Sequence, residues 1–259
     1  MAGLFDLEFH EKKIKEYQPT LAKLDLVIDW EMFRETIEKA LYVEPKGAGG
    51  RPPFDKIMMF KILILQKYYN LSDEQTEFQI NDRTSFKQFL GLKIGDTIPD
   101  EKTIWHFKEQ LANKDLSKSL FEMFAVALMD KGIIAKEGSI VDATFVDVPK
   151  QRNSKEDNAD IKKGAVPLKF GKKDKNGKQS KLCQKDTDAR WMTKSGEKHF
   201  GFKDHINADE KTKLITKYSV TSAAPHDSTE IENIVDETDN RLHADSAYRS
   251  KEIEEHLKA

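Results

Sequence analysis

Apolar residues recur every three or four positions through the first half of the chain, which is the period of an amphipathic helix. One such stripe joins Trp30, Phe33, Ile37 and Leu41. A second stripe runs through residues 57–69, where further apolar residues widen it. A face of that width predicts a helix at the centre of a bundle.

Capping residues, proline and glycine mark where the predicted helices begin and end. Ser72 opens a capping-box pattern, and Pro99-Asp100 is a stop followed by a cap. Gly132 follows the last apolar stripe and is a natural C-terminal breaker. We therefore predict a helical domain over residues 1–133.

A different pattern begins after this domain. Residues 138–149 are β-branched and aromatic, are bounded by glycine and proline, and are apolar on both sides of Asp142. A strand that is apolar on both faces is typical of the middle of a sheet. We therefore predict a central strand that carries Asp142.

Two runs farther along the chain alternate between apolar and polar residues. In residues 198–206, Phe202 and Ile206 lie on one side, and Lys203 and His205 lie on the other. A turn and a second alternating run, 213–221, follow. This order predicts an antiparallel hairpin.

The remaining elements complete an α/β pattern. Residues 227–239 predict a helix with its cap at the first or second residue, the stretch 241–250 contains a short strand, and 250–259 predict a last helix. The order strand, hairpin, helix, strand, helix favours a mixed sheet. We predict a second domain over residues 134–259.

A lysine-rich segment, residues 150–185, separates the first strand from the hairpin. It holds 12 Lys and Arg against 4 Asp and Glu, a local charge of +8, in a chain whose net charge is −2. Its low apolar content predicts a flexible loop. Such a loop is either solvated surface or a contact to a phosphate backbone, and its place beside a candidate metal site favours the second. The lysines that we expect to contact DNA from this loop are Lys162, Lys163, Lys172 and Lys173.

Composition adds two expectations about where the protein acts. The single cysteine, Cys183, fits a reducing cytosol. The N-terminus lacks a basic start followed by an apolar core, and the apolar run 57–69 is shorter than the ~20 residues of a spanning helix. We expect a cytoplasmic protein without a membrane partner.

Two acids stand out as candidate metal ligands. Asp142 lies within an apolar strand, where a buried anion is costly unless something pairs with it. On its own it fits a hydrogen-bonded structural residue or an ion pair at least as well as a ligand of Mg²⁺. Asp245 also ends a short strand, and the two carboxylates converge if the strands are neighbours. Asp147 is an odd number of residues from Asp142 and should face the other side.

Other kinds of site find no support. His199 and His205 share a face, but no HxH or HExxH pattern is present, so a zinc site is not predicted. The segment 46–52 follows a helix and lacks the ending of a phosphate-binding loop, and it is better explained as a linker. No serine stands in a GxSxG context.

Several blocks of this sequence resemble bacterial insertion-sequence transposases of the IS-five group, within the wider IS-four-like superfamily. Residues 50–92 and 98–111 resemble the helical N-terminal region of that group. "IVDATFVDVPKQRN", residues 187–228 and "HADSAYRS" resemble its catalytic part, in the expected order. The resemblance runs from about Gly50 to the end of the sequence.

This resemblance implies a DDE transposase with an RNase H-like catalytic domain. Asp142 and Asp245 match the first two acids of the family, whose implied role is to hold two Mg²⁺ ions, roughly 3.5–4 Å apart, with Mn²⁺ as a substitute. The implied reaction is hydrolysis at the transposon end, followed by transfer of the freed 3′ end into target DNA.

The implied partner is double-stranded DNA. The helical region would bind the terminal inverted repeats, and the implied assembly is a homodimer on DNA in the bacterial nucleoid. The catalytic part would contact DNA through Arg190, Trp191, Lys198 and Lys203.

The third acid of the family is a Glu on a helix well downstream of the second Asp. The sequence stops before that position, and we do not assign the role to Glu252, Glu254 or Glu255. The expectation is an incomplete, C-terminally truncated RNase H-like domain whose last strand has an exposed edge. Whether the chain is an active enzyme is left open. It is a transposase, a non-catalytic DNA-binding remnant or, least favoured, a stand-alone metal-dependent nuclease.

Overall fold

The fold is described from a computed structural model of the chain. The chain divides into two compact units, residues 1–123 and 124–259, and each is described by itself. The predicted boundary at residue 133 stays a prediction. The residues that the structure describes are 6–17, 19–44, 47, 52–135, 137–167, 169–173, 179–181, 183, 185–194, 196–235, 241–245 and 248.

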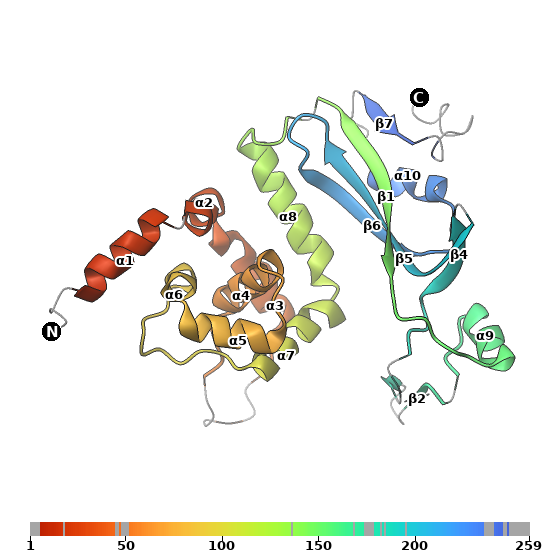
Figure 1. Cartoon of the computed structure of the whole chain (residues 1–259), viewed down its shortest axis with the longest axis horizontal. Coiled ribbons are helices and arrows are strands. Elements are labelled where there is room, and N and C mark those ends of the chain that lie inside the picture. The colour runs from red at the N-terminus through yellow and green to blue at the C-terminus, as the bar shows by residue number, and fades with distance from the viewer. Residues whose placement is uncertain are drawn as a thin grey trace. The chain divides into compact units, whose positions relative to one another are not determined.

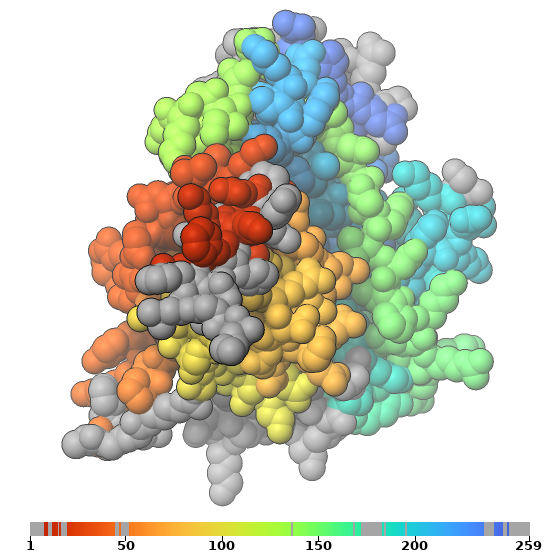
Figure 2. All heavy atoms as spheres, turned by 60° about the vertical axis from the view of Figure 1, so that its left-hand side comes forward, coloured from red at the N-terminus to blue at the C-terminus, as the bar shows by residue number. Residues whose placement is uncertain are grey.

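The first unit is helical, as its apolar stripes predict (Figure 1). The helices α1 and α2 pack on α6, and Figure 2 shows α1 and α2 in red beside the orange and yellow atoms of this unit. The last helix, α8, begins in this unit and ends in the next. The elements are α1 (Asp6–Tyr17), α2 (Pro19–Val27), η1 (Trp30–Phe33), α3 (Arg34–Ala40), α4 (Lys56–Tyr68), α5 (Asp73–Asp82), α6 (Thr84–Leu90), α7 (Glu101–Asn113) and α8 (Leu116–Asp130).

Helix α4 is the centre of this unit. It contacts α3, α5, α6 and α7, and Ile62 and Leu65 on its apolar face are fully buried. The other predicted stripe is also buried, from Trp30 to Leu41. Both predictions are confirmed, because a wide apolar face is removed from water only when helices surround it.

The predicted helix starts are also confirmed. The Ser72 hydroxyl accepts a hydrogen bond from the Gln75 amide at 3.1 Å, and the Gln75 side chain accepts one from the Ser72 amide at 3.1 Å. Asp100 accepts from the amide of Thr103 at 2.7 Å. These caps satisfy amides that have no partner within the helix, and so they fix where α5 and α7 begin.

The second unit is built on one mixed sheet (Figure 1). The long strand β5 pairs antiparallel with β1 on one side, and with β4 and then β6 on the other. β7 pairs with β1 in parallel, so β1 is an inner strand, as predicted. The elements are β1 (Ser139–Asp147), α9 (Lys155–Lys162), β2 (Gly171–Lys173), β3 (Gln179–Lys181), β4 (Arg190–Lys194), β5 (Glu197–Asp209), β6 (Ile215–Ser222), η2 (Asp227–Glu230), α10 (Ile231–Ile234) and β7 (Leu242–Ala244).

Gly201 lies where β5 exchanges one partner strand for another. It pairs with Arg190 of β4, and the next residue, Phe202, begins the pairing with β6. A Cβ at Gly201 would overlap the carbonyl oxygen of Val146 on β1. Only glycine therefore allows β1 to approach so closely at this point.

The predicted hairpin is confirmed as β5 and β6, but its polar face is the buried one. Lys203, His205, Asn207 and Asp209 are each at most 2% exposed, whereas Ile206 on the opposite face is only partly buried. The burial is possible because each of these four side chains has at least one polar partner. Lys203 donates to the carbonyl of Pro225 at 2.6 Å and forms an ion pair with Asp227 at 2.7 Å.

The same buried polar side chains of β5 keep the segment that follows β6 packed on the sheet. The Asn207 amide donates to the carbonyl of Ile234, the last residue of α10, at 2.8 Å. His205 lies 3.0 Å from the Thr221 hydroxyl through Nε2. α10 adds Ile231 and Ile234 to a small core with Val141 of β1.

Two predictions about local structure need correction. The basic segment 150–185 is not a structureless loop, since it contains α9 and the two-stranded ribbon β2–β3. Ser154 and Asp157 form a capping box that starts α9. The predicted helix 227–239 is shorter than expected, because the described helical turns η2 and α10 end at Ile234. The predicted helix 250–259 lies outside the described residues.

Asn207→Ala should destabilise the second unit by about 1–3 kcal/mol, because it leaves the buried carbonyl of Ile234 without its donor. Urea unfolding followed by circular dichroism measures the change. Lys198→Ala is the matched control, since Lys198 is exposed on the same strand and its loss should change stability by less than about 0.5 kcal/mol. Equal effects of the two substitutions would contradict the prediction.

Candidate functional site

The sheet brings the two predicted acids to neighbouring positions. In the parallel pairing of β1 and β7, Val141 lies opposite Ala244. Asp142 and Asp245 each come one residue later, so the register sets them side by side on adjacent strands. Adjacent strands are about 4.8 Å apart, which lets two carboxylates share one cation.

Asp142 differs in one respect from what the sequence predicts. It is exposed rather than buried, because its neighbours Val141 and Ala143 face the core and Asp142 takes the other side of the strand. One carboxylate oxygen accepts a hydrogen bond from the amide of Ala143 at 2.8 Å. This bond restrains the side chain, and exposure makes the anion accessible without a large desolvation penalty.

Asp147 lies at the other end of β1 and is engaged elsewhere. Its carboxylate is 3.4 Å from Nδ1 of His199, and the His199 ring stacks on Phe145 with centroids 4.9 Å apart. This arrangement fits the expectation that Asp147 faces away from Asp142.

The two carboxylates are the type of ligand that a hard divalent cation prefers. Asp142 and Asp245 are both exposed carboxylates, and Mg²⁺ prefers such oxygen ligands together with water and phosphate oxygens. The described part of the chain contains no group of three or more His, Cys, Asp or Glu residues that could hold a metal ion. The described residues therefore bring two carboxylates to this position.

A network of buried and part-buried polar side chains lies near the acid pair, and no pattern in the sequence marks it as part of the site. Tyr248 is buried, and its hydroxyl lies 3.4 Å from Nδ1 of His205. Glu230 accepts a hydrogen bond from the Ser219 hydroxyl at 2.7 Å. Two features of the sequence indicate this network only weakly. Tyr248 is an aromatic residue three positions after Asp245, and Glu230 is an acid near the start of a predicted helix.

The N-cap of η2 is also not the predicted residue. Nδ1 of His226 accepts a hydrogen bond from the amide of Ser228 at 3.3 Å, so His226 provides the cap instead of Asp227 or Ser228. This frees the carboxylate of Asp227 for its ion pair with buried Lys203.

An aromatic and basic surface lies on β4 and the start of β5. Trp191 is 50% exposed, and the Lys150 ammonium is 5.9 Å from the centre of its ring. Trp191, Met192, Thr193 and Lys198 line a shallow pocket of about 350 Å³. An exposed indole flanked by ammonium groups suits stacking and phosphate contacts.

The other predicted DNA contacts have different surroundings. The Arg190 guanidinium donates to the carbonyls of Thr187 and Ile161, at 2.7 and 3.3 Å, and Lys203 is buried. Neither suits a direct contact to DNA. Lys162 and Lys163 are exposed at the end of α9. Lys172 and Lys173 belong to β2, and their side chains lie outside what the structure describes.

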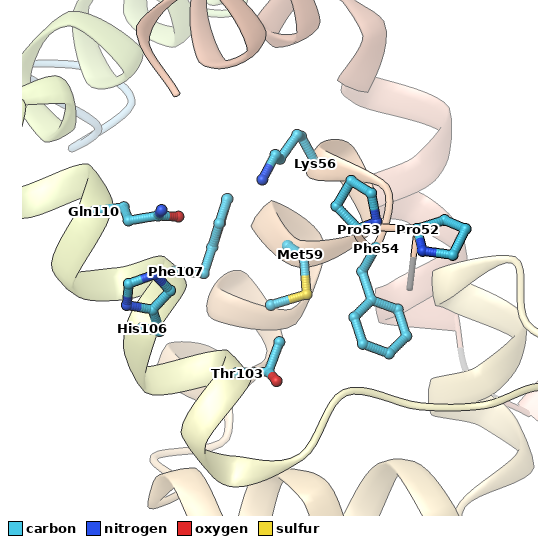
Figure 3. A pocket seen from close by; sticks show the side chains of 9 residues that line it. All are labelled: Pro52, Pro53, Phe54, Lys56, Met59, Thr103, His106, Phe107 and Gln110. Carbon is cyan, nitrogen blue, oxygen red and sulfur yellow. The ribbon is translucent and has the colours of Figure 1, made fainter. Parts of the chain in front are cut away.

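The helical unit has a pocket of its own, of about 280 Å³, between the start of α4 and α7 (Figure 3). Pro52 and Pro53, which directly precede Phe54 and helix α4, line it together with Phe54. Figure 3 shows Lys56 and Gln110 approaching Phe107 from the two helices. The Lys56 ammonium is 5.8 Å from the centre of the Phe107 ring. The remaining lining residues are Met59, Thr103 and His106.

Comparisons with known families match both parts of the chain. Residues 8–110 match the family described as Transposase domain (DUF772), and residues 134–259 match the family described as Transposase DDE domain. Each of the two segments is thus similar to a transposase domain. These matches support a DDE transposase with a role in transposition, which implies DNA as its substrate and the use of divalent metal ions.

The second match contains the whole sheet. Asp142 and Asp245 both fall within the Transposase DDE domain, as do Trp191 and Lys198. No solved structure matches the chain. Within the described residues, no helix is both long and apolar enough to cross a membrane.

Stability of the DDE domain should fall as the pH drops through about 6.5. Burial lowers the pKa of His205 below its ordinary value of 6.5, and Lys203 acts in the same direction, while Asp227 and Glu230 oppose them. The unfolded chain therefore takes up a proton on this ring at a pH where the folded chain does not, which favours unfolding.

Urea unfolding at about pH 7.5 and about pH 5.5 measures this dependence around the histidine pKa. The wild-type chain should lose more stability over this interval than His205→Gln, which cannot take up the proton. His226→Gln is the control, because His226 is exposed. Parallel pH profiles of wild type and His205→Gln would disprove the prediction.

Proposed function

We propose that this chain is the transposase of an insertion sequence of the IS-five group, which binds the element's ends, cleaves a strand there and joins the freed end to target DNA. Asp142 and Asp245 are proposed as acidic ligands of Mg²⁺ in this reaction. The observation that carries the proposal is the parallel register of β1 and β7, which sets these two acids side by side.

The topology supports an RNase H-like assignment for the DDE domain. Three antiparallel strands, β1, β5 and β6, are followed by a helix and by β7, which is parallel to β1. That is the order which the family resemblance implies. The inner position of β1, paired on both sides, gives Asp142 a rigid support.

When bound, the metal ions supply an activated water or 3′-hydroxyl and stabilise the leaving oxygen of the phosphodiester. The residues of the chain hold and orient the reacting groups. Asp142 and Asp245 present carboxylate oxygens from adjacent strands, and the amide of Ala143 fixes one oxygen of Asp142. Trp191 and Lys198 are proposed to contact DNA from the same domain, with Lys162, Lys163, Lys172 and Lys173 of the basic segment.

The helical unit is proposed to bind the terminal inverted repeats, and the active assembly to be a homodimer on DNA within the bacterial nucleoid. The basic segment supports a polyanionic partner, because its charge of +8 is concentrated in 36 residues of a chain with a net charge of −2.

A second candidate function is DNA binding without catalysis. One observation favours it: among the residues that the structure describes, Asp142 and Asp245 have no third acid beside them that completes a metal-binding group. The third ligand expected from the family resemblance stays a prediction, because Glu252, Glu254 and Glu255 lie outside the described residues.

Substitution of either acid should separate the two functions. Asp142→Asn and Asp245→Asn should each reduce Mg²⁺-dependent cleavage of a transposon-end duplex at least about a hundredfold, because charge stabilisation by the metal contributes several kcal/mol. End binding, measured by gel shift, should be retained. Asp147→Asn is the matched control, since Asp147 lies on the same strand and pairs with His199.

The results of these measurements distinguish the enzymatic function from DNA binding without catalysis. Loss of cleavage in the two variants, but not in Asp147→Asn, supports the metal-ligand assignment. If the wild-type chain binds the ends and shows no cleavage with Mg²⁺ or Mn²⁺, the non-catalytic function replaces the enzymatic one. Full cleavage by Asp142→Asn would refute the assignment of that residue.

DNA contacts by the basic surface should appear in the salt dependence of binding. Lys198→Ala should weaken binding at all sequences and reduce the slope of log K against log salt by about 1, as expected when one phosphate contact is lost. Lys211→Ala is the control, because Lys211 is also exposed but lies beside Glu137, just beyond the opposite end of β5. Equal slopes for Lys198→Ala and wild type would contradict the contact.

A further inference from the structure

The inference concerns Tyr248, which follows the exposed Asp245 by three residues yet is only 3% exposed itself. The two residues are joined by a backbone hydrogen bond, in which the Tyr248 amide donates to the Asp245 carbonyl at 3.0 Å. That bond links Tyr248 to the residue that directly follows β7. The position of the Tyr248 main chain and that of Asp245 are therefore coupled.

The Tyr248 ring is anchored beneath both acid-bearing strands. It packs in a small core with Val141 of β1 and with Ile231 and Ile234 of α10, and Leu242 of β7 packs against the same core. Val141 immediately precedes Asp142. A large aromatic side chain in this core thus binds the segment after β7 to the inner face of the sheet.

The polar end of the ring is held as well. The Tyr248 hydroxyl lies 3.4 Å from Nδ1 of His205, and Nε2 of His205 lies 3.0 Å from the Thr221 hydroxyl. His205 is fully buried in the polar row of β5. A chain of contacts therefore runs from β6 through β5 to the segment that carries Asp245.

The contact between the Tyr248 hydroxyl and Nδ1 of His205 suits a hydrogen bond, because a phenol can donate and a ring nitrogen without a proton can accept. Burial lowers the pKa of His205, which favours the neutral ring that such an acceptor needs.

From this geometry we propose that Tyr248 is a positioning residue for Asp245: by linking the segment after β7 to His205 and to the core, it holds the Asp245 carboxylate beside Asp142 for metal binding. Tyr248 itself contacts neither metal nor DNA in this scheme. The inference rests on the proposed function, in which the two acids bind a divalent cation. It accounts for a buried tyrosine and histidine that the proposed reaction does not otherwise use.

The test is Mn²⁺ binding to the full chain, measured from the electron paramagnetic resonance signal of free Mn²⁺ with a short transposon-end duplex present. Tyr248→Phe keeps the ring and removes only the link to His205. Tyr248→Leu also removes most of the ring packing. Since residues that orient metal ligands typically contribute 10–100-fold to affinity, we expect Tyr248→Leu to weaken binding about tenfold or more, and Tyr248→Phe about threefold.

Tyr218→Phe is the matched control, a tyrosine on β6 of the same sheet whose substitution should leave Mn²⁺ affinity unchanged. Thermal unfolding of each variant without metal gives the second measurement. Tyr248→Phe should unfold within a few degrees of wild type, because its ring still fills the core.

The possible results separate the inference from the proposed function. If Asp142→Asn and Asp245→Asn abolish Mn²⁺ binding but both Tyr248 variants bind like wild type, Tyr248 is only a core residue and the inference is overturned. If the two Asp variants bind like wild type, or wild type binds no Mn²⁺, the proposed metal site fails and the inference fails with it. Weaker binding by Tyr248→Phe, with an unchanged unfolding temperature, supports a positioning role.

Discussion

Four polar side chains of β5 determine how the second unit is assembled. Lys203, His205, Asn207 and Asp209 alternate along one face of the strand, and all are removed from water. Such burial is tolerated because each of the four side chains has at least one polar partner, and a side chain without one would cost more than most apolar contacts supply. The partners are therefore constrained, and the connection from β6 to α10 has one acceptable path across the sheet.

This constraint also explains why the acid pair has a defined environment. Lys203 neutralises Asp227, and His205 reaches Tyr248, so the network extends from the middle of the sheet to the segment after β7. The apolar contribution beneath the acids is small, limited to a few residues around Val141. Order at this edge of the sheet thus depends on directional polar contacts more than on a large hydrophobic core.

The positions of the helices and strands could be predicted from the sequence better than the burial and contacts of their side chains. Helical period and capping residues such as Ser72 are local signals, and they located α4, α5 and α7. The identity of the buried face of β5 is not local: it depends on acceptors such as the Pro225 carbonyl, which only the fold brings near Lys203. For the same reason, the sequence predicts that Asp142 and Asp245 lie side by side only if the two strands that carry them are neighbours. The contribution of Tyr248 had no periodic signal at all.

The parallel pairing of β1 with β7 joins positions about a hundred residues apart, which makes it among the least local contacts of the domain. During synthesis the helical unit and the β1–β5–β6 part of the sheet can form from residues already made. The acid pair cannot exist until β7 has been translated and docked. A nascent chain is thus able to fold its first unit well before it has both carboxylates, and the proposed metal-binding pair is complete only once β7 has paired with β1.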